Sequence, residues 1–453
     1  MNSNRELFET MPVRKALTKM AIPTIISQLI TMIYNLADTF FIGQTNNSYM
    51  VAAVSVSYML FYILTALSNL LGIGGGSLIS RMLGEHRDEE CRNVCSFSLY
   101  TSALVGVLYS LGVLVFMEPI LNLIGTSENT IAFCRQYLFW VVVVGGLPTM
   151  LSLTMSHLLR NIGHAKKSSF GIGMGGILNI ILDPIFMFLI LKPGNEVIGA
   201  AVATMLSNVI SFIYFAVVFF RLKDSTILCY SIKKLKPHKG AIPAIFLVGL
   251  PAMLGPLLAA ISNIVVNNLM VSYNDFAIAA MGIVKKVDMI PLSISQGVAQ
   301  AMLPLVAYNY ASKDYKRMND FTKASQFCVM GFAFACVIVF EMFALYIITP
   351  FIKDPQTVEY GVRFLRIAVI GTPFMGYNIL TTFNFQAVGK GAESIVISSC
   401  RQGVISIPFM FLMNRIAGLF GLAWTQTLAD ILTFIIAFVL YRRFYKRLRS
   451  SQL

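Results

Sequence analysis

The chain has 453 residues, of which 57% are hydrophobic and 12% charged, and its formal net charge is +14. Soluble domains have about 45–50% apolar and about 25% charged residues, so this composition excludes an ordinary soluble protein. Several stretches contain no charge, and each is about as long as the roughly 20 residues that cross a bilayer as a helix. The sequence therefore predicts an all-α polytopic membrane protein. The uncharged stretches are residues 39–80, 93–117, 136–159, 197–220, 240–274, 289–312 and 367–389.

Twelve transmembrane helices follow from these stretches together with four further tracts that hold few charges. The alternating strands of about ten residues that are typical of an outer-membrane barrel are absent from the sequence. The first twenty residues lack the short apolar core and small-residue cleavage site of a signal peptide, so we expect none to be removed. In chain order the predicted helices span residues 17–42, 51–80, 94–116, 133–158, 167–190, 197–220, 243–272, 276–308, 322–349, 359–386, 395–413 and 418–441.

Lysine and arginine are distributed unequally between the two sides of this topology. Of the 35 basic residues, 26 lie on the side of the N-terminus, including Arg160 between the fourth and fifth helices. Three lie in loops on the other side, namely Lys192, Lys353 and Arg415. By the positive-inside rule, both termini are cytoplasmic in a multi-pass protein of the plasma membrane. The net positive charge then reflects basic loops that face an anionic leaflet, and no basic soluble element predicts nucleic-acid binding.

The seven cysteines and four histidines predict neither disulfides nor a bound metal. Three cysteines lie in or beside cytoplasmic loops, where thiols stay reduced, and the other four lie within predicted helices. The spacing of Cys91 and Cys95 is not that of a zinc site. The glycine-rich segment 72–76 lacks the Gly-Lys-Ser/Thr ending of a phosphate-binding loop, so we expect no ATP site and no cofactor. Transport, if this is a transporter, must then be secondary.

A second glycine pattern, at residues 171–176, matches the letters of a dinucleotide-binding fingerprint. It lies in an apolar membrane segment with no preceding strand, which is the wrong structural context for that fingerprint. We therefore expect Gly171 and Gly175 to form a small-residue face against which another helix packs.

The second half of the sequence repeats landmarks of the first half at a lag of about 222–228 residues. Similar apolar composition alone is the alternative explanation, but prolines and glycines match at several separate places, which favours duplication. The order is preserved, so the two halves are parallel and a pseudo-twofold axis runs along the membrane normal, with a central cleft between the lobes. The landmarks are Pro23 with Pro251, Asn35 with Asn263, Pro148 with Pro373, Gly163 with Gly389, Asp183-Pro184 with Ile407-Pro408, and Gly199 with Gly421. We predict an N-terminal six-helix lobe (1–221), a cytoplasmic linker (222–240) and a C-terminal six-helix lobe (241–453).

Several segments resemble those of the multidrug and toxic compound extrusion (MATE) transporters. The residues that carry the resemblance are Met11-Pro12-Val13-Arg14-Lys15-Ala16, Tyr34-Asn35-Leu36-Ala37-Asp38-Thr39-Phe40-Phe41-Ile42-Gly43-Gln44, Gly72-Ile73-Gly74-Gly75-Gly76-Ser77, His157-Leu158-Leu159-Arg160-Asn161-Ile162-Gly163, Gln296-Gly297-Val298 and Tyr308-Asn309-Tyr310. The resemblance covers essentially the whole chain and is closest to the bacterial branch that includes the MepA-like and DinF-like exporters. It implies an antiporter that exports amphipathic, often cationic compounds in exchange for H⁺ or Na⁺ by alternating access.

Asp38 is the first carboxylate within a predicted span. An ionised carboxylate in hydrocarbon costs about 2.5–3.5 kcal/mol on insertion scales, so Asp38 should face the bundle interior, unless it is a helix-end group that reaches outer water. Asn179 and Asp183 are four residues apart and therefore share one helix face. The resemblance implies that these three residues and Thr204 form one ion-coupling site. The alternative for Asn179 and Thr204 is that they only satisfy the hydrogen bonds of their neighbours.

The identity of the coupling ion stays open at this point. Four oxygen-bearing side chains approach the minimum for sodium, whereas two nearby carboxylates in a low dielectric disfavour ionisation of both and so favour a bound proton. We expect protons to drive export and sodium to bind or partly substitute. In other branches of the family the C-terminal lobe carries carboxylates in its first and fourth helices, but residues 243–272 and 367–389 contain none, which argues against ion coupling there.

Four further polar residues within spans are candidates for the substrate cavity: His157, Lys285, Lys286 and Asp288. Lys285 and Asp288 are spaced to pair on one helix face, and a purely structural ion pair explains them equally well. Two other functions compete with drug export. A flippase for a lipid-linked saccharide, a distant relative of these transporters, would need a strongly cationic cavity, and an intramembrane enzyme would need a nucleophile with its base or a metal cluster. The sequence shows neither a nucleophile with its base nor a metal cluster. We therefore expect a monomeric, non-enzymatic protein whose partners are small-molecule drugs and the lipid bilayer.

Overall fold

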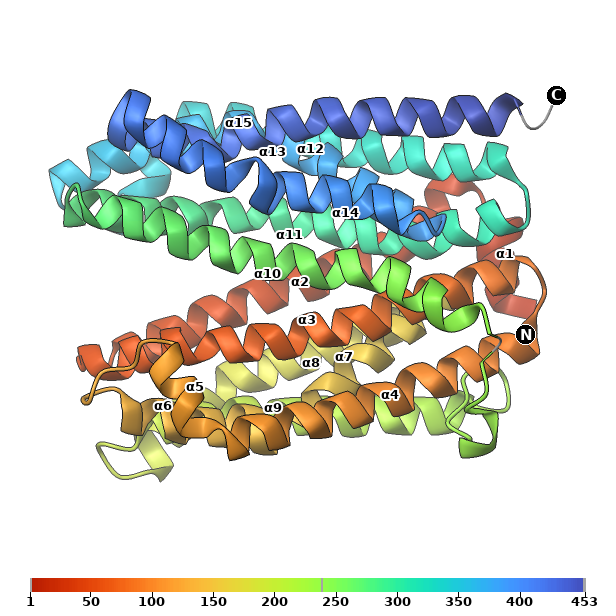
Figure 1. The fold of residues 1–453 in the computed structure, drawn as a ribbon, viewed down its shortest axis with the longest axis horizontal. Helices are drawn as coiled ribbons and strands as arrows, with labels where there is room; N and C mark the ends of the chain where they lie inside the picture. The colour runs from red at the N-terminus through yellow and green to blue at the C-terminus, as the bar shows by residue number, and fades with distance from the viewer. Residues whose placement is uncertain (1, 238, 451–453) are drawn as a thin grey trace.

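A computed structural model of the protein describes residues 2–237 and 239–450, and all regular structure in this part of the chain is helical (Figure 1). The helices form two bundles, which we call the first bundle (α1 to α9) and the second bundle (α10 to α15). The helices of the first bundle are α1 (Asn2–Glu9), α2 (Val13–Gly43), α3 (Ser48–Gly84), α4 (Asp88–Val115), α5 (Met117–Leu123), α6 (Ile131–Leu138), η1 (Phe139–Val144), α7 (Gly146–Asn161), α8 (Ala165–Pro184), η2 (Ile185–Ile190) and α9 (Glu196–Leu222).

A short 3₁₀ turn, η3 (Ile232–Lys234), lies in the segment that joins the bundles. The helices of the second bundle are α10 (Ala241–Val271), α11 (Asp275–Ala311), α12 (Tyr315–Ile348), α13 (Pro355–Ala387), α14 (Gly391–Ser399), η4 (Cys400–Val404) and α15 (Ser406–Ser450). Both chain ends described in the structure lie at the same end of the molecule (Figure 1), which we call the termini end.

Twelve membrane passes can be assigned to these helices, as the sequence predicts. Within the described residues, eight helical segments are long and apolar enough to cross a membrane, and α6 to η1 with α7, bent by 50°, makes a ninth. The more polar α11 and α13 are 37 and 33 residues long and supply two more. α15 contains a break at Gly418 (φ 56°), a left-handed conformation that favours glycine, and the chain reverses there to give the twelfth pass.

Short polar residues begin several of these helices, because a free side-chain oxygen can accept from the unpaired N–H groups of the first turn. Asn47 accepts from Tyr49 N at 3.0 Å at the start of α3, and Asn274 accepts from Ala277 N at 2.7 Å at the start of α11. Asp354 accepts from Thr357 N at 2.8 Å just before Pro355, the first residue of α13. A polar side chain just before the helix thus caps the start of these three spans.

Close helix contacts depend on glycines. In the segment 72–76 of α3, an added Cβ at Gly72 would lie 2.8 Å from His157 of α7, and one at Gly74 would lie 2.3 Å from the carbonyl oxygen of Ile245 in α10. The predicted packing face on α8 is also confirmed, since a Cβ at Gly175 would lie 2.2 Å from Ser211 Oγ of α9. Backbones approach this closely in membranes only where side chains are small.

The two bundles contact each other mainly through α2 and α3 on one side and α10 and α11 on the other. Gly249 of α10 packs directly on α3, since an added Cβ there would lie 2.0 Å from Leu70 O. Hydrogen bonds join the two bundles from the middle of the spans to the termini end; for example, Ser77 Oγ donates to Gln386 O at 2.7 Å. In Figure 1 the ribbons of the two bundles converge toward that end and diverge toward the other.

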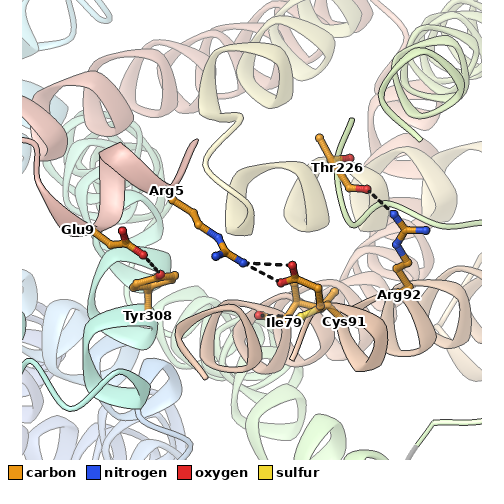
Figure 2. Close-up of polar contacts among 8 residues, drawn as sticks. Arg5, Glu9, Ile79, Cys91, Arg92, Thr226 and Tyr308 are labelled. Atoms are coloured by element: carbon orange, nitrogen blue, oxygen red, sulfur yellow. Dashed lines mark hydrogen bonds and ion pairs between the residues drawn. The ribbon is translucent and has the colours of Figure 1, made fainter. Parts of the chain in front are cut away.

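The short helix α1 lies across the termini end and touches both bundles. Arg5 Nη2 donates to both carboxylate oxygens of Asp88, at 3.2 and 3.1 Å, at the start of α4. Figure 2 shows Glu9 pointing the other way, toward the hydroxyl of Tyr308 in α11, which donates to it. The Phe8 and Tyr308 rings stack with centroids 4.8 Å apart. This helix therefore closes the termini end with contacts to each side.

Candidate functional site

A cavity of about 460 Å³ lies between the two bundles. Its wall includes the aromatic side chains Tyr34, Tyr58, Phe61 and Tyr62 together with many hydroxyl and amide groups. The volume falls within the roughly 300–1,000 Å³ of small-molecule sites. The described residues that line it include no carboxylate and no lysine. The basic side chains among them are Arg160, Arg401 and His157.

The cavity is closed on the side of the termini end by polar contacts between the bundles. Gln28 Nε2 donates to Gln296 Oε1 at 3.4 Å, and Arg160 Nη1 donates to Gln300 Oε1 at 2.5 Å. Both bonds run from a helix of the first bundle to α11. These contacts therefore tie the two bundles together on that side of the cavity.

Asp38, Asn179, Asp183 and Thr204 meet on the first-bundle side of the cavity. Asn179 Nδ2 donates to Asp183 Oδ1 at 3.1 Å and lies 3.2 Å from Thr204 Oγ1. Asp183 is fully buried and Asp38 is 9% exposed, and the two are close enough to interact electrostatically. Asn179 and Thr204 reach the cavity wall, whereas the two carboxylates lie behind it.

Three oxygens of this group have no hydrogen-bond partner although they are buried: Asp38 Oδ1, Asn179 Oδ1 and Asp183 Oδ2. Buried acceptors without a donor are costly, and unpaired carboxylates more so. A sodium ion, which takes oxygen ligands, would satisfy all three, whereas a proton would turn one carboxylate oxygen into a donor for one of the others. The geometry is thus that of a cluster of hydrogen-bond acceptors rather than of a closed hydrogen-bond network.

Local sequence explains how these side chains come together. Asn179 and Asp183 lie one turn apart on α8, and Pro184 then removes a backbone donor, after which the π-helical segment η2 begins. Gly176 lets α2 pack closely on α8, since an added Cβ would lie 2.9 Å from Ile30. That contact carries Asp38, two turns further along α2, to the same region as Asp183.

The second bundle holds a different polar group, an ion pair between two helices that the sequence analysis did not predict. Arg401 of η4 donates from Nε to Asp430 Oδ1 of α15 at 2.6 Å, and both side chains are largely buried. Gln426 Nε2 donates to the other carboxylate oxygen at 3.2 Å, and Asn378 Nδ2 donates to the Asp430 carbonyl at 2.9 Å. A sequence signal existed, because Arg401 is the one charged residue of the apolar tract 394–414 and Asp430 is the one charged residue of the tract 416–441.

The four cavity candidates lie in different surroundings. His157 lines the cavity, and its Nε2 is 3.1 Å from Asn69 Oδ1. Lys285, Lys286 and Asp288 are not among the lining residues. Lys285 Nζ donates to Asn267 Oδ1 at 3.3 Å, and no ion pair between Lys285 and Asp288 occurs in the part of the chain that the structure describes. Lys286 is exposed.

Arg160 was counted above with the loop residues, and that placement is wrong. It lies in the last turn of α7, is 4% exposed, and lines the cavity. Sequence reasoning missed it because the neighbouring Asn161, Gly163 and His164 are typical of a loop. The helix in fact continues to Asn161, whose side-chain Nδ2 donates to His157 O at 2.9 Å.

Comparison with known proteins agrees with this architecture. The MatE family model matches residues 23–185 and again residues 251–412, so the chain belongs to the MatE family, the MATE transporters that its sequence resembles. The two matches begin 228 residues apart, which confirms the parallel repeat.

Two relatives are similar over nearly the whole chain. The multidrug export protein MepA of Staphylococcus aureus (strain MRSA252) is 32% identical over 433 residues, which are 96% of this chain and 94% of that protein. MepA of Staphylococcus haemolyticus (strain JCSC1435) is 31% identical over 435 residues, with the same coverage. A solved structure described as the outward-facing conformation of a multidrug resistance MATE family transporter has a TM-score of 0.92 at 22% identity and covers 99% of each chain, which confirms the fold.

Proposed function

We propose that this protein is a secondary multidrug efflux antiporter, which exports amphipathic compounds in exchange for H⁺ or Na⁺. The relatives named MepA are multidrug export proteins and are similar over 96% of the chain, which supports the export function. The observation that carries the antiport part is the pair of buried carboxylates, Asp38 and Asp183, whose unpartnered oxygens lie directly behind the wall of the cavity. We propose no enzymatic activity and no cofactor other than the coupling ion.

For the orientation of the protein in the membrane and the boundaries of its lobes, we keep the predictions made from the sequence. We place the termini end in the cytoplasm of a bacterium with the chain spanning the inner membrane, because the basic residues gather at that end. With this orientation, the contacts of Gln28 and Arg160 with α11 lie on the cytoplasmic side of the cavity, which supports an outward-facing state. The lobes are then residues 1–221 and 241–453, joined by the linker 222–240, and the protein acts as a monomer.

Coupling would arise from differential affinity. One H⁺ or Na⁺ at Asp38 and Asp183 would neutralise one of their two buried charges. Asn179, which bonds Asp183 and Thr204 and lines the cavity with Thr204, would transmit its presence to the cavity wall. A ligand shifts a conformational equilibrium only by as much as its affinity differs between the two states. Ion binding from outside would therefore favour the state that has released the exported compound, and ion release inside would reset the cavity.

Vesicles loaded with ethidium and energised separately with a proton gradient or a sodium gradient test this function. We expect the proton gradient alone to drive export, and sodium to support part of the rate. Raising the external pH should weaken proton-driven export, because it reduces the inward proton gradient. Export that requires ATP, or that ignores both gradients, would contradict the proposal.

A further inference from the structure

The last helix, α15, presents an exposed apolar face to the membrane. Figure 1 shows this helix at the outer edge of the second bundle, with its last turns at the termini end. Ile435, Phe438 and Val439 are exposed, whereas Ala437 between them is fully buried. Because the protein spans the membrane, apolar side chains that are exposed within a span contact lipid tails.

Three cations continue this face toward the end of the helix. Arg442, Lys446 and Arg449 are all exposed, and they lie 7, 11 and 14 residues after Ile435. An α-helix has 3.6 residues per turn, so these spacings place the three cations on the same side of α15 as Ile435. We call Arg442, Lys446 and Arg449 the cationic face.

The opposite side of the same turns is fixed against the bundle. Phe444 is 7% exposed, and its ring centroid lies 5.9 Å from that of Phe385 in α13 and 6.2 Å from that of Tyr310 in α11. The last turns of α15 therefore continue to pack on the second bundle beyond the apolar stretch. This packing holds the cationic face toward the surroundings of the protein.

The depth of Arg442 matches that of a lipid headgroup. Residues 419–439 follow the break at Gly418, and at 1.5 Å per residue they span the roughly 30 Å of the hydrocarbon core. Arg442 is the first charged residue after this stretch. Its Cζ lies 5.0 Å from the centroid of the Phe438 ring, so its guanidinium stays beside a side chain that contacts lipid tails.

No described carboxylate balances the cationic face. None of the nine ion pairs among the described residues includes any of its three side chains, and residues 431–450 contain no aspartate or glutamate. The counterpart of α15 in the first bundle is α9, which ends at Leu222, with Asp224 directly after Lys223. The repeat therefore carries this extended row of unpaired cations only in its second half.

We propose that the cationic face of α15 binds a phospholipid with a negatively charged headgroup, in the leaflet at the termini end. The tails lie along Ile435 and Phe438, and the phosphate accepts from Arg442 and Lys446. Clusters of lysine and arginine beside a span attract anionic lipids, and a guanidinium binds phosphate through two parallel hydrogen bonds. The positive-inside rule calls for cations on this side of the membrane but on no particular helix face, so topology alone does not explain their alignment with the apolar face.

This lipid site is separate from the exported compound. None of the residues that form it lines the cavity between the bundles. The proposal therefore depends neither on the coupling ion nor on what the cavity accepts, and it is tested on the purified full-length protein without transport.

Native mass spectrometry of the protein in detergent, titrated with phosphatidylglycerol or with phosphatidylcholine of the same acyl chains, measures the preference. A cation next to the membrane contributes about fivefold in affinity for an anionic lipid, so we expect the wild type to retain phosphatidylglycerol about tenfold or more over phosphatidylcholine. Replacing the three cations of the cationic face by Gln should remove most of this preference. Arg442→Lys keeps the charge and should retain most of it.

A control variant removes the same number of charges elsewhere at the termini end. The triple variant Lys166→Gln, Arg221→Gln and Lys316→Gln changes three exposed cations and should keep the preference within about twofold of the wild type. If the triple variant of the cationic face does not fold, Arg442→Gln alone decides the test, with an expected loss of about fivefold.

Thermal unfolding separates a lipid site from a site for free phosphate. Phosphatidylglycerol should raise the melting temperature of the wild type more than that of the cationic-face variant, and sodium phosphate at the same concentration should raise neither. The inference is overturned if the cationic-face variant keeps the full preference for phosphatidylglycerol, if the control variant loses as much, or if free phosphate stabilises the wild type as well as the lipid does.

Discussion

Arg317 of α12 donates from Nε to the carbonyl oxygen of Phe8 over 2.6 Å and so ties the second bundle to the N-terminal helix. Its Nη2 donates to Met11 O, also at 2.6 Å. One side chain therefore holds both the end of α1 and the start of α2. Since Arg5 of the same short helix binds Asp88 of α4, α1 joins the two bundles at the termini end.

Replacing Arg317 by Gln should loosen that junction. Hydrogen bonds to charged groups contribute about 1.5–3 kcal/mol, so we expect amide hydrogen exchange in residues 5–11 to accelerate about tenfold or more. Lys316→Gln is the matched control, because Lys316 is the neighbouring exposed residue and should leave exchange unchanged. Equal exchange in the wild type and in Arg317→Gln would show that α1 is held by other contacts.

Asp38→Asn should remove ion-driven export while the protein still folds. The amide keeps the shape of the carboxylate but cannot change its charge when an ion binds, so the coupling, typically 5- to 150-fold, is lost. Gradient-driven ethidium efflux is the measurement, with expression and thermal unfolding as checks. Glu341→Gln serves as control, because Glu341 pairs with Arg366 away from the cavity and should leave efflux intact. Normal efflux by Asp38→Asn would remove this residue from the mechanism.

Substitutions of Thr204 should distinguish between the two proposed coupling ions. Its hydroxyl oxygen lies 3.2 Å from Asn179 Nδ2, at the edge of the unpartnered acceptors. Thr204→Ala removes an oxygen that could ligate sodium, so we expect sodium-driven export to fall about tenfold while proton-driven export changes little. Thr204→Ser keeps the hydroxyl and should behave as the wild type. An equal loss under both gradients would mean that Thr204 acts on packing or on substrate, not on the ion.

Removing one partner of the Arg401 and Asp430 ion pair should cost far more stability than replacing both partners by apolar residues. The side chains are 14% and 5% exposed, so removing one leaves an uncompensated buried charge, at about 3–5 kcal/mol of stability. The double variant Arg401→Met with Asp430→Leu should recover most of that loss in thermal unfolding. The exposed pair Arg363 with Glu359 is the control, and Arg363→Gln should change stability by about 0.5 kcal/mol or less. A double variant as unstable as the single ones would refute this account.

Gly249→Ala should disturb the contact between the bundles. The added Cβ would lie 2.0 Å from Leu70 O, and a backbone atom cannot move aside as a flexible side chain can. Overpacking of this kind costs about 1–3 kcal/mol, so we expect lower thermal stability and faster hydrogen exchange in α3 and α10 near this contact. Gly282→Ala on α11, where nothing lies within 4 Å of the added carbon, should have no such effect. Equal thermal stability and equal hydrogen exchange in the two variants would show that the bundles can move apart at Gly249 without a loss of stability.

The sequence by itself determined the membrane class, the twelve passes and the parallel repeat, because each rests on local or periodic information. An uncharged run of twenty residues is readable without knowing its neighbours, and so is the charge asymmetry of the loops. The one-turn spacing of Asn179 and Asp183 also follows from helix geometry, and the hydrogen bond between them confirms that they share a face. The role of these residues in ion coupling stays a prediction.

Only the tertiary structure decided which side chains meet across helices. Lys285 and Asp288 were expected as candidates to pair because both lie on one helix, yet Lys285 donates to Asn267 of α10. The buried ion pair of the second bundle instead joins Arg401 and Asp430, which lie on different helices. Arg160 could not be placed from its sequence neighbours, because its burial depends on α11 lying against the end of α7. Spacing along a chain fixes the face of a helix on which a residue lies. The rotation and contacts of each helix in the bundle, which fix what that face meets, depend on the packing of all the others.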